Sequence, residues 1–469
     1  MSSERIESFI DTPSSIYEND SPIWQPPQSH PTVSEEPYGS LVPFAEPSWY
    51  SRPNPYYNAS HHQLRGSVRA WTDEYLIPNA FKWEEAGEVD PKAYRAAAEA
   101  GILVPLAFGN RIPSEWVDKQ DRRGIIGNIE PREWNGFHEM VINDEINRVG
   151  GFGPAMGLFV GLQLGVPPIY NFGSEELKAR VLPGILRGDK RICLATSEPD
   201  AGSDVKNIGT TAVLSPDGKH YIVNGTKQWI NNGAYSDWFT TSVRTSGKPG
   251  DINGISMLLI PRCEGVTTTK LLMGGQWSSG ICLLTFKDVK VPVENLIGKE
   301  GQAFKYIMFN FNRERLWGAC MCIRMARVCI EDSMAWAAQR RVFEKTLLQQ
   351  PVIRTKFANM ARVVECQQAW IESLIFQIEH MTLEEANIKL AAPIALLKAN
   401  ASMVLERVAR DAVQIFGGRG YMRGGPAERV ERVWRDVKGA SIPGGSEEVM
   451  LDFGIRHSVK VAQGQGARL

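Results

Sequence analysis

The chain has 469 residues, of which 43% are hydrophobic and 22% charged, and its 52 basic and 53 acidic residues give a formal net charge of −1. That length exceeds a single hydrophobic core, so we expect two or three globular domains. The charge balance gives no general attraction to nucleic acid, and no apolar run approaches the ~20 residues of a membrane span, so we predict a partner of neither kind.

The first segment, residues 1–57, is rich in Pro, Ser, Tyr and acidic residues and poor in aliphatic ones. This composition predicts a disordered or surface-draped N-terminal arm. Its carboxylates, among them Glu4, Glu7 and Asp11, argue against a mitochondrial transit peptide. The arm also lacks the apolar segment of a secretory signal, so we expect a protein that is not secreted.

Residues 58–190 carry helical signals. Leu64, Val68 and nearby apolar residues keep near-helical spacing, and an Ala-rich run begins at Pro91. The stretch between residues 110 and 133 is polar and interrupted by Pro and Gly, which predicts a loop insertion. We therefore predict a helical domain over residues 58–190.

Residues 191–298 change to a strand pattern. Residues 210–214 and 220–223 flank a Ser-Pro-Asp-Gly turn, which predicts a hairpin. Runs rich in β-branched and aromatic residues follow at 237–245, 255–260 and 281–286. These runs predict a middle β domain.

Residues 299–469 are helical again. The stretch from Gly301 to about Arg341 predicts one helix of roughly 60 Å at about 1.5 Å per residue. Apolar positions over residues 353–378 and 397–415 mark two further helices. Helices, then strands, then a helical bundle predict an α+β protein of three parts.

The remaining composition bears on metals and location. The seven cysteines are scattered through apolar sequence and the seven histidines show no ligand spacing, so we predict reduced, intracellular cysteines and no metal site. The chain ends in Ala467-Arg468-Leu469, which is similar to the Ser-Lys-Leu type of peroxisomal address. We expect a peroxisomal or cytoplasmic protein.

Two motifs hold the most chemical information. Residues 191–205 read RICLATSEPDAGSDV, and residues 227–233 read KQWINNG. Together they supply hydroxyls, amides and backbone N–H groups around an aromatic surface, which suits a planar ring with polar edges such as a flavin. Without a family in view, the same residues fit two loops of a β domain equally well.

The motifs resemble, in order, those of the acyl-CoA dehydrogenase flavoproteins. Residues 197–204 match the family's loop for flavin and substrate, and residues 227–233 match its second flavin loop. Residues 340–350 resemble the stretch that reaches the flavin diphosphate of a neighbouring subunit, and residues 412–418 resemble the segment that holds the adenine end. The resemblance extends over nearly everything after residue 58.

The resemblance implies an N-terminal all-α domain, a middle β-barrel-like domain and a C-terminal four-helix bundle, assembled as a homodimer or homotetramer. It implies FAD as the cofactor, an acyl-CoA as the substrate, α,β-dehydrogenation as the reaction, and an electron-transfer flavoprotein or O2 as the acceptor. The residues that it assigns to FAD are Leu194, Thr196, Ser197, Trp229, Asn231, Arg340, Phe343, Gln350, Gln414, Gly418 and Ser446. Those that it assigns to the substrate are Ser203, Phe311, Asn312 and Arg315.

The catalytic base is where this chain departs from many family members. Their base is a Glu in a Tyr-Glu-Gly-Thr loop near the C-terminus, and here Gly444 stands at the position of that Glu. Gly444 has no side chain to remove a proton, although its N–H is able to hold the thioester oxygen. The isovaleryl and long-chain types place the base just before an Arg on the first long bundle helix, where this chain has Glu314-Arg315. The resemblance therefore assigns the base to Glu314, and Glu447 and Glu448 are interpreted as charges at a helix N-terminus.

Three further positions leave alternatives open. Asn231 stands where most family members carry Thr, and Trp277 replaces an Arg, so the hydrogen bonding around the flavin is expected to differ. Trp317, one turn past Glu314, either shapes the acyl pocket or is a core residue.

Other functions on the same fold are an acyl-CoA oxidase, a DNA-associated flavoprotein and a catalytically silent flavoprotein. Nitroalkane oxidases are disfavoured because they keep a carboxylate where Gly444 stands.

Overall fold

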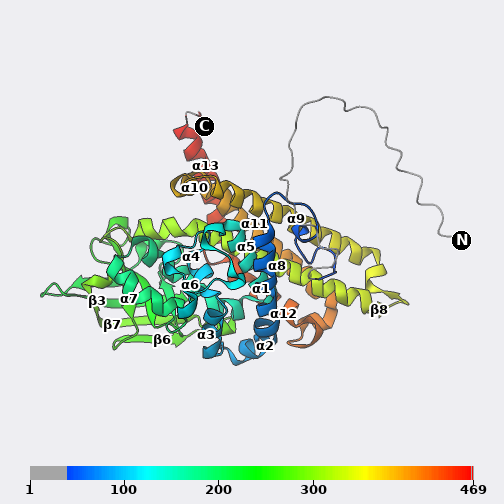
Figure 1. Cartoon of the computed structure of the whole chain (residues 1–469), viewed down its shortest axis with the longest axis horizontal. Coiled ribbons are helices and arrows are strands. Elements are labelled where there is room, and N and C mark those ends of the chain that lie inside the picture. Colours follow the sequence, from blue (N-terminus) through cyan, green and yellow to red (C-terminus); the bar gives the residue numbers. More distant parts are fainter. Residues whose placement is uncertain (1–39, 466, 468–469) are drawn as a thin grey trace.

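A computed structural model describes residues 40–465 and residue 467. Figure 1 shows the strands gathered at one end of the molecule and the long helices of the C-terminal part extending to the other. The first helices lie between them (Figure 1). The predictions for residues 1–39 and for the terminal Arg468-Leu469 fall outside the described residues.

Four of the seven N-terminal helices, α1, α3, α5 and α7, begin at residues whose side chains cap them. Asn58 accepts hydrogen bonds from the Ser60 and His61 N–H groups, and Asp90 accepts one from Lys92 N at 2.9 Å. Residues 110–133 form only short 3-10 turns, as the loop pattern predicts. The helices are α1 (Ala59–Trp71), α2 (Ile77–Ala86), α3 (Pro91–Glu99), α4 (Leu103–Phe108), α5 (Gly136–Ile146), α6 (Phe152–Phe172) and α7 (Glu175–Leu186).

Helix α6 bears on the expectation that the chain has no membrane span. It has 21 residues and is apolar enough to cross a membrane by length and composition, and no other single helix of the described residues meets that test. The share of its apolar window that is buried inside the protein is 94%, as expected for a core helix. It contains Pro167 and Pro168, although proline is unusual inside a helix.

Residues 40–57 are not disordered: they lie against the helices and are anchored by a few buried side chains. Trp49 is buried and stacks on Tyr57 with ring centroids 4.0 Å apart. Glu46 pairs with three arginines, Arg65, Arg69 and Arg324, at 2.8–3.0 Å. The acidic and aromatic residues that suggested disorder are therefore the partners of a buried cationic cluster.

The middle part is a curled sheet around its own core, in the order β1-β4-β2-β3-β7-β6 with β5 on the other side of β4. Strands β2 and β3 form the predicted antiparallel hairpin, and β1 runs parallel to β4. The sequence pattern missed β1 and β6, which are short. The strands are β1 (Ile192–Ala195), β2 (Thr211–Leu214), β3 (His220–Ile230), β4 (Trp238–Arg244), β5 (Ile255–Pro261), β6 (Val266–Lys270) and β7 (Cys282–Pro292).

The C-terminal part is a helical bundle with α11 in contact with four other long helices, α8, α9, α12 and α13. Thr382 and Glu385 form the capping box that their spacing predicts. A small hairpin follows α8 and projects at the end of the molecule opposite the large sheet (Figure 1). The elements are α8 (Ala303–Gln339), β8 (Arg341–Val342), β9 (Lys345–Thr346), α9 (Pro351–Glu379), α10 (Leu383–Lys389), α11 (Ala391–Phe416), α12 (Glu428–Ser441) and α13 (Glu447–Gly464).

Candidate active site

The two sequence motifs lie side by side where β1 ends and β3 bulges. Gln228 N donates to Ser197 O at 3.0 Å. Lys227 Nζ donates to Thr196 O at 3.1 Å and to Glu198 Oε1 at 2.7 Å. The Thr196 side chain is held in turn, because its Oγ1 lies 3.0 Å from Ser242 Oγ of β4. The loop that carries Thr196 and Ser197 is thus fixed by protein contacts alone.

A buried ion pair braces that loop. Glu198 accepts hydrogen bonds from the Gly209 and Thr210 N–H groups at 2.6 and 2.9 Å in addition to the one from Lys227. Burial lowers the pKa of Lys227 to about 8, although the Glu198 carboxylate opposes that shift. Burial would raise the pKa of Glu198, but Lys227 and the backbone donors outweigh it and lower that pKa. Each partner therefore keeps the other charged inside the protein.

The bulge in β3 leaves two side chains available to a ligand. Trp229 has φ 65° and is 50% exposed, so its ring faces outward from a left-handed backbone position. Asn231 Oδ1 is buried, yet no group of the described residues donates to it. Asn232, by contrast, is fully engaged: its Nδ2 donates to Met156 O and Ser279 O, and its Oδ1 accepts from Gly161 N. An aromatic surface beside an unsatisfied buried acceptor fits the edge of a polar ring such as a flavin.

Glu314 lies on α8 and is half-buried. Asn310, one turn earlier, donates from Nδ2 to Glu314 Oε1 at 2.7 Å. Burial raises the pKa of Glu314 to about 7, against the opposing effects of the Asn310 hydrogen bond and of Arg315 and Arg313. A carboxylate with this pKa is suited to take a proton near neutral pH.

Arg315 and Gly444 join α8 to the loop before α13. Arg315 is buried and donates from Nε to Gly444 O at 3.1 Å, with its guanidinium 5.0 Å from the ring centroid of Phe311. Lys398 Nζ holds the next carbonyl, Gly445 O, at 2.6 Å. The Gly444 N–H donates to nothing among the described residues, and nothing lies within 4 Å of where a side chain would stand. The loop is thus held by its carbonyls, and the Gly444 N–H is among the backbone donors that it leaves free for a ligand.

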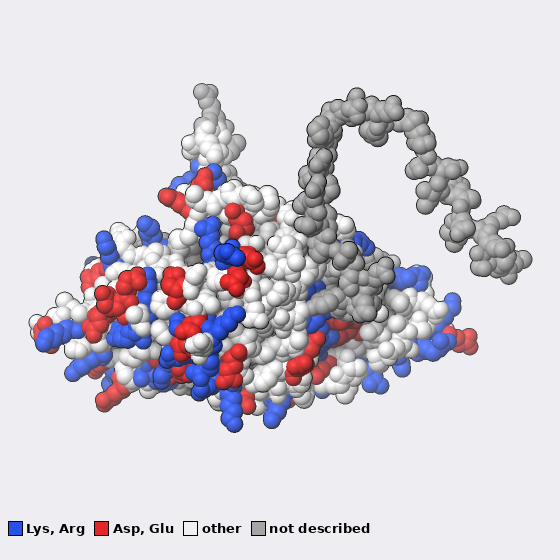
Figure 2. All heavy atoms as spheres, in the orientation of Figure 1, with Lys and Arg blue, Asp and Glu red and all other residues white. Residues whose placement is uncertain are grey.

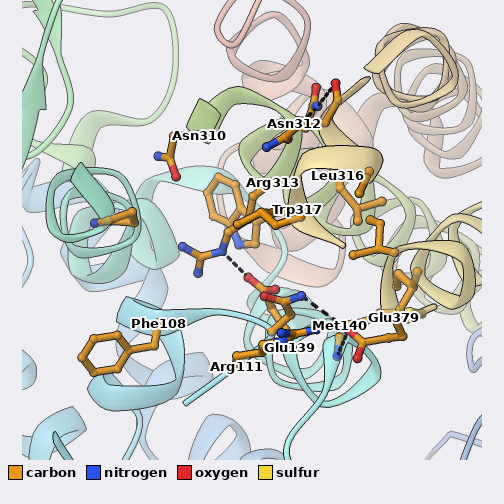
Figure 3. Close-up of a pocket in the computed structure, with 18 of the residues that line it drawn as sticks. Phe108, Arg111, Glu139, Met140, Asn310, Asn312, Arg313, Leu316, Trp317 and Glu379 are labelled. Atoms are coloured by element: carbon orange, nitrogen blue, oxygen red, sulfur yellow. Dashed lines mark hydrogen bonds and ion pairs between the residues drawn. The ribbon is translucent and has the colours of Figure 1, made fainter. Parts of the chain in front are cut away.

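A cavity of about 400 Å³ opens on the neighbouring face of α8. Asn310, Arg313 and Trp317 line it from α8, and Phe108, Met140 and Glu379 are among the residues on its other walls (Figure 3). Arg313 Nε donates to Glu139 Oε1 at 2.8 Å within it (Figure 3). Asn312 also lines the cavity, and its Nδ2 donates to Asn387 Oδ1 of α10 at 3.1 Å.

The other residues that the resemblance assigns lie elsewhere in this chain. Ser203 is exposed in the loop after β1, and Ser446 is the N-cap residue of α13. Gln414 and Gly418 are exposed at the end of α11. Arg340, Phe343 and Gln350 surround the β8–β9 hairpin, at the far end from the large sheet (Figure 1). The structure therefore does not bring this last group to the β1–β3 site of the same chain.

Three residues of the site were missed by the sequence analysis. Asn310 stands four residues before Glu314, a spacing that brings helix side chains together and so was a usable signal. Lys398 is a buried lysine in an apolar helix, and such a residue needs partners. Asn143 of α5, which accepts a hydrogen bond from the Trp317 indole, gave no local signal.

The described residues contain no group of three or more His, Cys, Asp or Glu side chains placed to hold a metal ion. The site instead combines a carboxylate of raised pKa, a free backbone N–H, an exposed aromatic ring and a large cavity. Proton removal next to a carbonyl, with a bound ring cofactor as acceptor, is chemistry that this arrangement is able to support.

Comparisons with known proteins agree on one family. Models for the N-terminal, middle and C-terminal domains of acyl-CoA dehydrogenase match residues 105–189, 193–289 and 301–458. The acyl-CoA dehydrogenase apdG of Emericella nidulans is 42% identical over 92% of this chain and 98% of its own length. Among solved structures, an acyl-CoA dehydrogenase from Geobacillus kaustophilus has a TM-score of 0.75 at 29% identity, covering 87% of this chain and 100% of that one. One from Bacillus anthracis, complexed with FAD, has a TM-score of 0.77 at 25% identity, covering 88% of this chain and 70% of that one. The chain therefore belongs to the acyl-CoA dehydrogenase family.

Proposed function

We propose that this protein binds FAD and dehydrogenates an acyl-CoA thioester between Cα and Cβ, with Glu314 as the base that takes the α proton. The observation that carries the proposal is the state of Glu314. Its carboxylate is half-buried and hydrogen-bonded to Asn310, and burial raises its pKa to about 7. A base with that pKa is partly ionised at neutral pH and accepts a proton readily.

The residues near β1 and β3 suit the isoalloxazine ring. Asn231 Oδ1 is a buried acceptor that lacks a donor, Trp229 offers an exposed aromatic surface, and Thr196 and Ser197 offer hydroxyls on a braced loop. When bound, FAD supplies the acceptor for the hydride that leaves Cβ. Leu194, half-buried in β1, adds an apolar contact beside these groups.

The chain must also stabilise the charge that develops on the thioester oxygen as the α proton leaves. A backbone N–H aimed at that oxygen lowers the barrier because it is already oriented before the reaction. The Gly444 N–H is free, and its loop is fixed by Arg315 and Lys398. We therefore assign Gly444 to hold the thioester oxygen, and assign Arg315 to position that loop. Ser203, Phe311 and Asn312 remain the proposed contacts to the rest of the acyl-CoA.

A second copy of the chain would complete the cofactor site. Arg340, Phe343 and Gln350 lie at the far end of the molecule from β1, and Phe343 is 92% exposed (Figure 1). An exposed Phe side chain on a projecting hairpin places apolar surface in water, which costs free energy unless a partner covers it. We propose a homodimer or homotetramer in which this hairpin meets the diphosphate of a neighbouring FAD. Gln414 and Gly418 flank Phe416, which stacks on Trp336 beside the hairpin, so we assign them to the adenine end of that same FAD, while Ser446 contacts the FAD of its own subunit.

We propose an electron-transfer flavoprotein as the acceptor, with O2 as the alternative. Figure 2 shows Lys and Arg interspersed with Asp and Glu over one face of the described residues. Such a mixed surface gives no support to the DNA-associated alternative, which needs a continuous basic surface.

The test is an anaerobic titration of the purified flavoprotein with saturated acyl-CoAs, followed by flavin absorbance. We expect bleaching of the flavin by at least one acyl-CoA. Readmission of air then separates the acceptors, since rapid recovery of colour indicates oxidase activity. A flavin that no acyl-CoA bleaches would contradict the proposed function.

A further inference from the structure

The loop between α12 and α13, residues 442–445, has few contacts of its own. Ile442 and Pro443 are exposed, and Gly444 and Gly445 have no side chains. In the part of the chain that the structure describes, neither the Gly444 N–H nor the Gly445 N–H donates to a backbone carbonyl. The position of the loop therefore depends on side chains that reach it from elsewhere in the fold.

Two cationic side chains hold this loop by its carbonyls. Arg315 of α8 donates from Nε to Gly444 O at 3.1 Å. Lys398 of α11 donates from Nζ to Gly445 O at 2.6 Å and to Ser441 O at 2.9 Å. Ser441 is the last residue of α12, and the carbonyls at a helix C-terminus lack helical donors and attract positive charge. The Lys398 ammonium thus connects the two ends of the loop.

These contacts relate the loop to the proposed base. Arg315 follows Glu314 directly on α8 and holds the carbonyl of Gly444, whose N–H is proposed to bind the thioester oxygen. Lys398 holds the next carbonyl from α11. A backbone N–H stabilises a developing oxyanion only when it is already aimed at that oxygen. A loosened loop would therefore weaken this stabilisation even with Glu314 in place.

Lys398 carries its charge in a buried position. The side chain is 5% exposed, and its hydrogen bonds go to carbonyl oxygens rather than to a carboxylate. Burial lowers the pKa of Lys398 to about 8; Cys322 of α8 and Glu447 of α13 oppose that effect, whereas Arg315 adds to it. Within the described residues, the other helices that pack against α11 contribute no titratable group with a comparable effect. The ammonium is thus charged at neutral pH and begins to lose its proton just above it.

We propose that Lys398 is a positioning residue for the dehydrogenation: its ammonium fixes the Gly444–Gly445 loop, and the loss of that charge at alkaline pH loosens the loop and slows removal of the α proton. A hydrogen bond from a charged donor is roughly twice as strong as one from a neutral donor, so the neutral amine holds the two carbonyls less firmly. The rate should then have an acid limit set by Glu314 and an alkaline limit set by Lys398. The inference rests on the proposed function and adds the group that sets its alkaline limit.

The test is the pH profile of anaerobic flavin reduction in the purified flavoprotein, from about pH 6 to about pH 10. The substrate is whichever of butanoyl-CoA, octanoyl-CoA and palmitoyl-CoA reduces the wild-type flavin fastest, at a saturating concentration. Lys398→Arg keeps a positive charge over this range because a guanidinium does not deprotonate there, whereas Lys398→Met removes the charge. Lys389→Met is the matched control, since Lys389 is exposed on α10 and donates to Glu385.

We expect the wild-type rate to fall with a midpoint near pH 8, and Lys389→Met to keep that profile. Lys398→Arg should retain most of the neutral-pH rate and lose the alkaline limb. Lys398→Met should be slower at neutral pH by at least ~10-fold, which is less than the typical effect of removing an oxyanion donor, and should also lack the limb.

A wild type that reduces its flavin without an alkaline limb would overturn the inference and leave the proposed function intact. So would a limb near pH 8 that persists in Lys398→Arg. If Lys398→Arg does not fold with FAD bound, Lys398→Met is held to the same expectation that the limb is absent. A wild type whose flavin none of the three thioesters reduces would overturn both the inference and the proposed function.

Discussion

Asn310 and Glu314 lie one turn apart on α8, and the Asn310 amide donates to the Glu314 carboxylate at 2.7 Å. The hydrogen bond favours the ionised carboxylate, whereas burial favours the protonated one and has the larger effect. The balance leaves the pKa of Glu314 at about 7. A base so placed is poised between the two states at neutral pH.

The role of Glu314 is tested by Glu314→Gln. The amide keeps the size of the side chain but is unable to accept the α proton. We expect the variant to retain FAD and to lose the rate of anaerobic flavin reduction at least ~10²-fold, a typical contribution of a general base. Stopped-flow absorbance gives the rate, and the ratio of flavin to protein gives the occupancy. Reduction at a near-normal rate would assign the base to another residue.

The contribution of Asn310 is tested through the pH dependence of the same rate. Asn310→Ala removes a hydrogen bond that lowers the pKa of Glu314, so that pKa should rise. Because the base acts in its ionised form, the acid limb of the rate profile should move to higher pH. Asn79→Ala serves as the control, since Asn79 bonds only to Tyr75 O of its own helical segment. An acid limb at the same pH in both variants would show that Asn310 does not tune the base.

Stability should also respond to pH through Glu314. Its pKa in the folded protein, about 7, lies above the ordinary value of 4.5, so the folded state binds the proton more tightly than the unfolded state does. The stabilising contribution of the protonated carboxyl is complete below pH ~4.5 and is lost as the pH rises toward 7. Glu314→Gln should therefore gain thermal stability relative to the wild type between pH 5 and pH 8, by up to about 3 kcal/mol. Melting curves of the wild type and Glu314→Gln at pH 5 and pH 8 check this. If the difference in melting temperature between the two proteins is the same at both pH values, the carboxyl is more solvated than its surroundings indicate.

The sequence predicted the order of elements because apolar periodicity and capping residues are local signals. The helix from residue 303 to 339 and the capping box at Thr382 followed from spacing alone. The same local signals failed for residues 40–57, whose burial depends on Arg65 and Arg324 far along the chain. Composition suggests disorder there because it does not reveal which distant groups will pair.

For the same reason, the sequence predicted only some of the residues of the candidate site. Motif resemblance identified Glu314, Gly444 and Asn231. The structure adds that Asn310 contacts Glu314 and that Arg315 holds the loop of Gly444. The tether of Trp317 to Asn143 joins α8 to α5 across 174 positions of sequence. No spacing rule reaches over that distance, so this contact became visible only in the fold.

Because Glu198 and Lys227 form a buried ion pair, the effects of substituting both on the free energy of unfolding should not be additive. Glu198→Leu alone leaves Lys227 charged and buried without its carboxylate, which typically costs about 3–5 kcal/mol. Lys227→Met added to it removes the orphaned charge, so the double variant should be more stable than Glu198→Leu. Denaturant unfolding of the variants without FAD measures this directly. Additive losses would show that water reaches the pair and solvates each charge separately.

A substitution at Gly444 distinguishes the stability lost through backbone strain from the loss of catalytic rate. Its φ of 69° is left-handed, where a side chain costs about 1–2 kcal/mol, but nothing within 4 Å would clash with the added methyl. Gly444→Ala should therefore fold with a loss of stability of about 1 kcal/mol, whereas Gly274→Ala, equally open and without a left-handed φ, should lose little. Because the Gly444 N–H is proposed to hold the thioester oxygen, a small shift of this loop should slow flavin reduction by more than the stability change accounts for. Full activity in a measurably destabilised Gly444→Ala would remove that N–H from the mechanism and leave the loop a purely structural part.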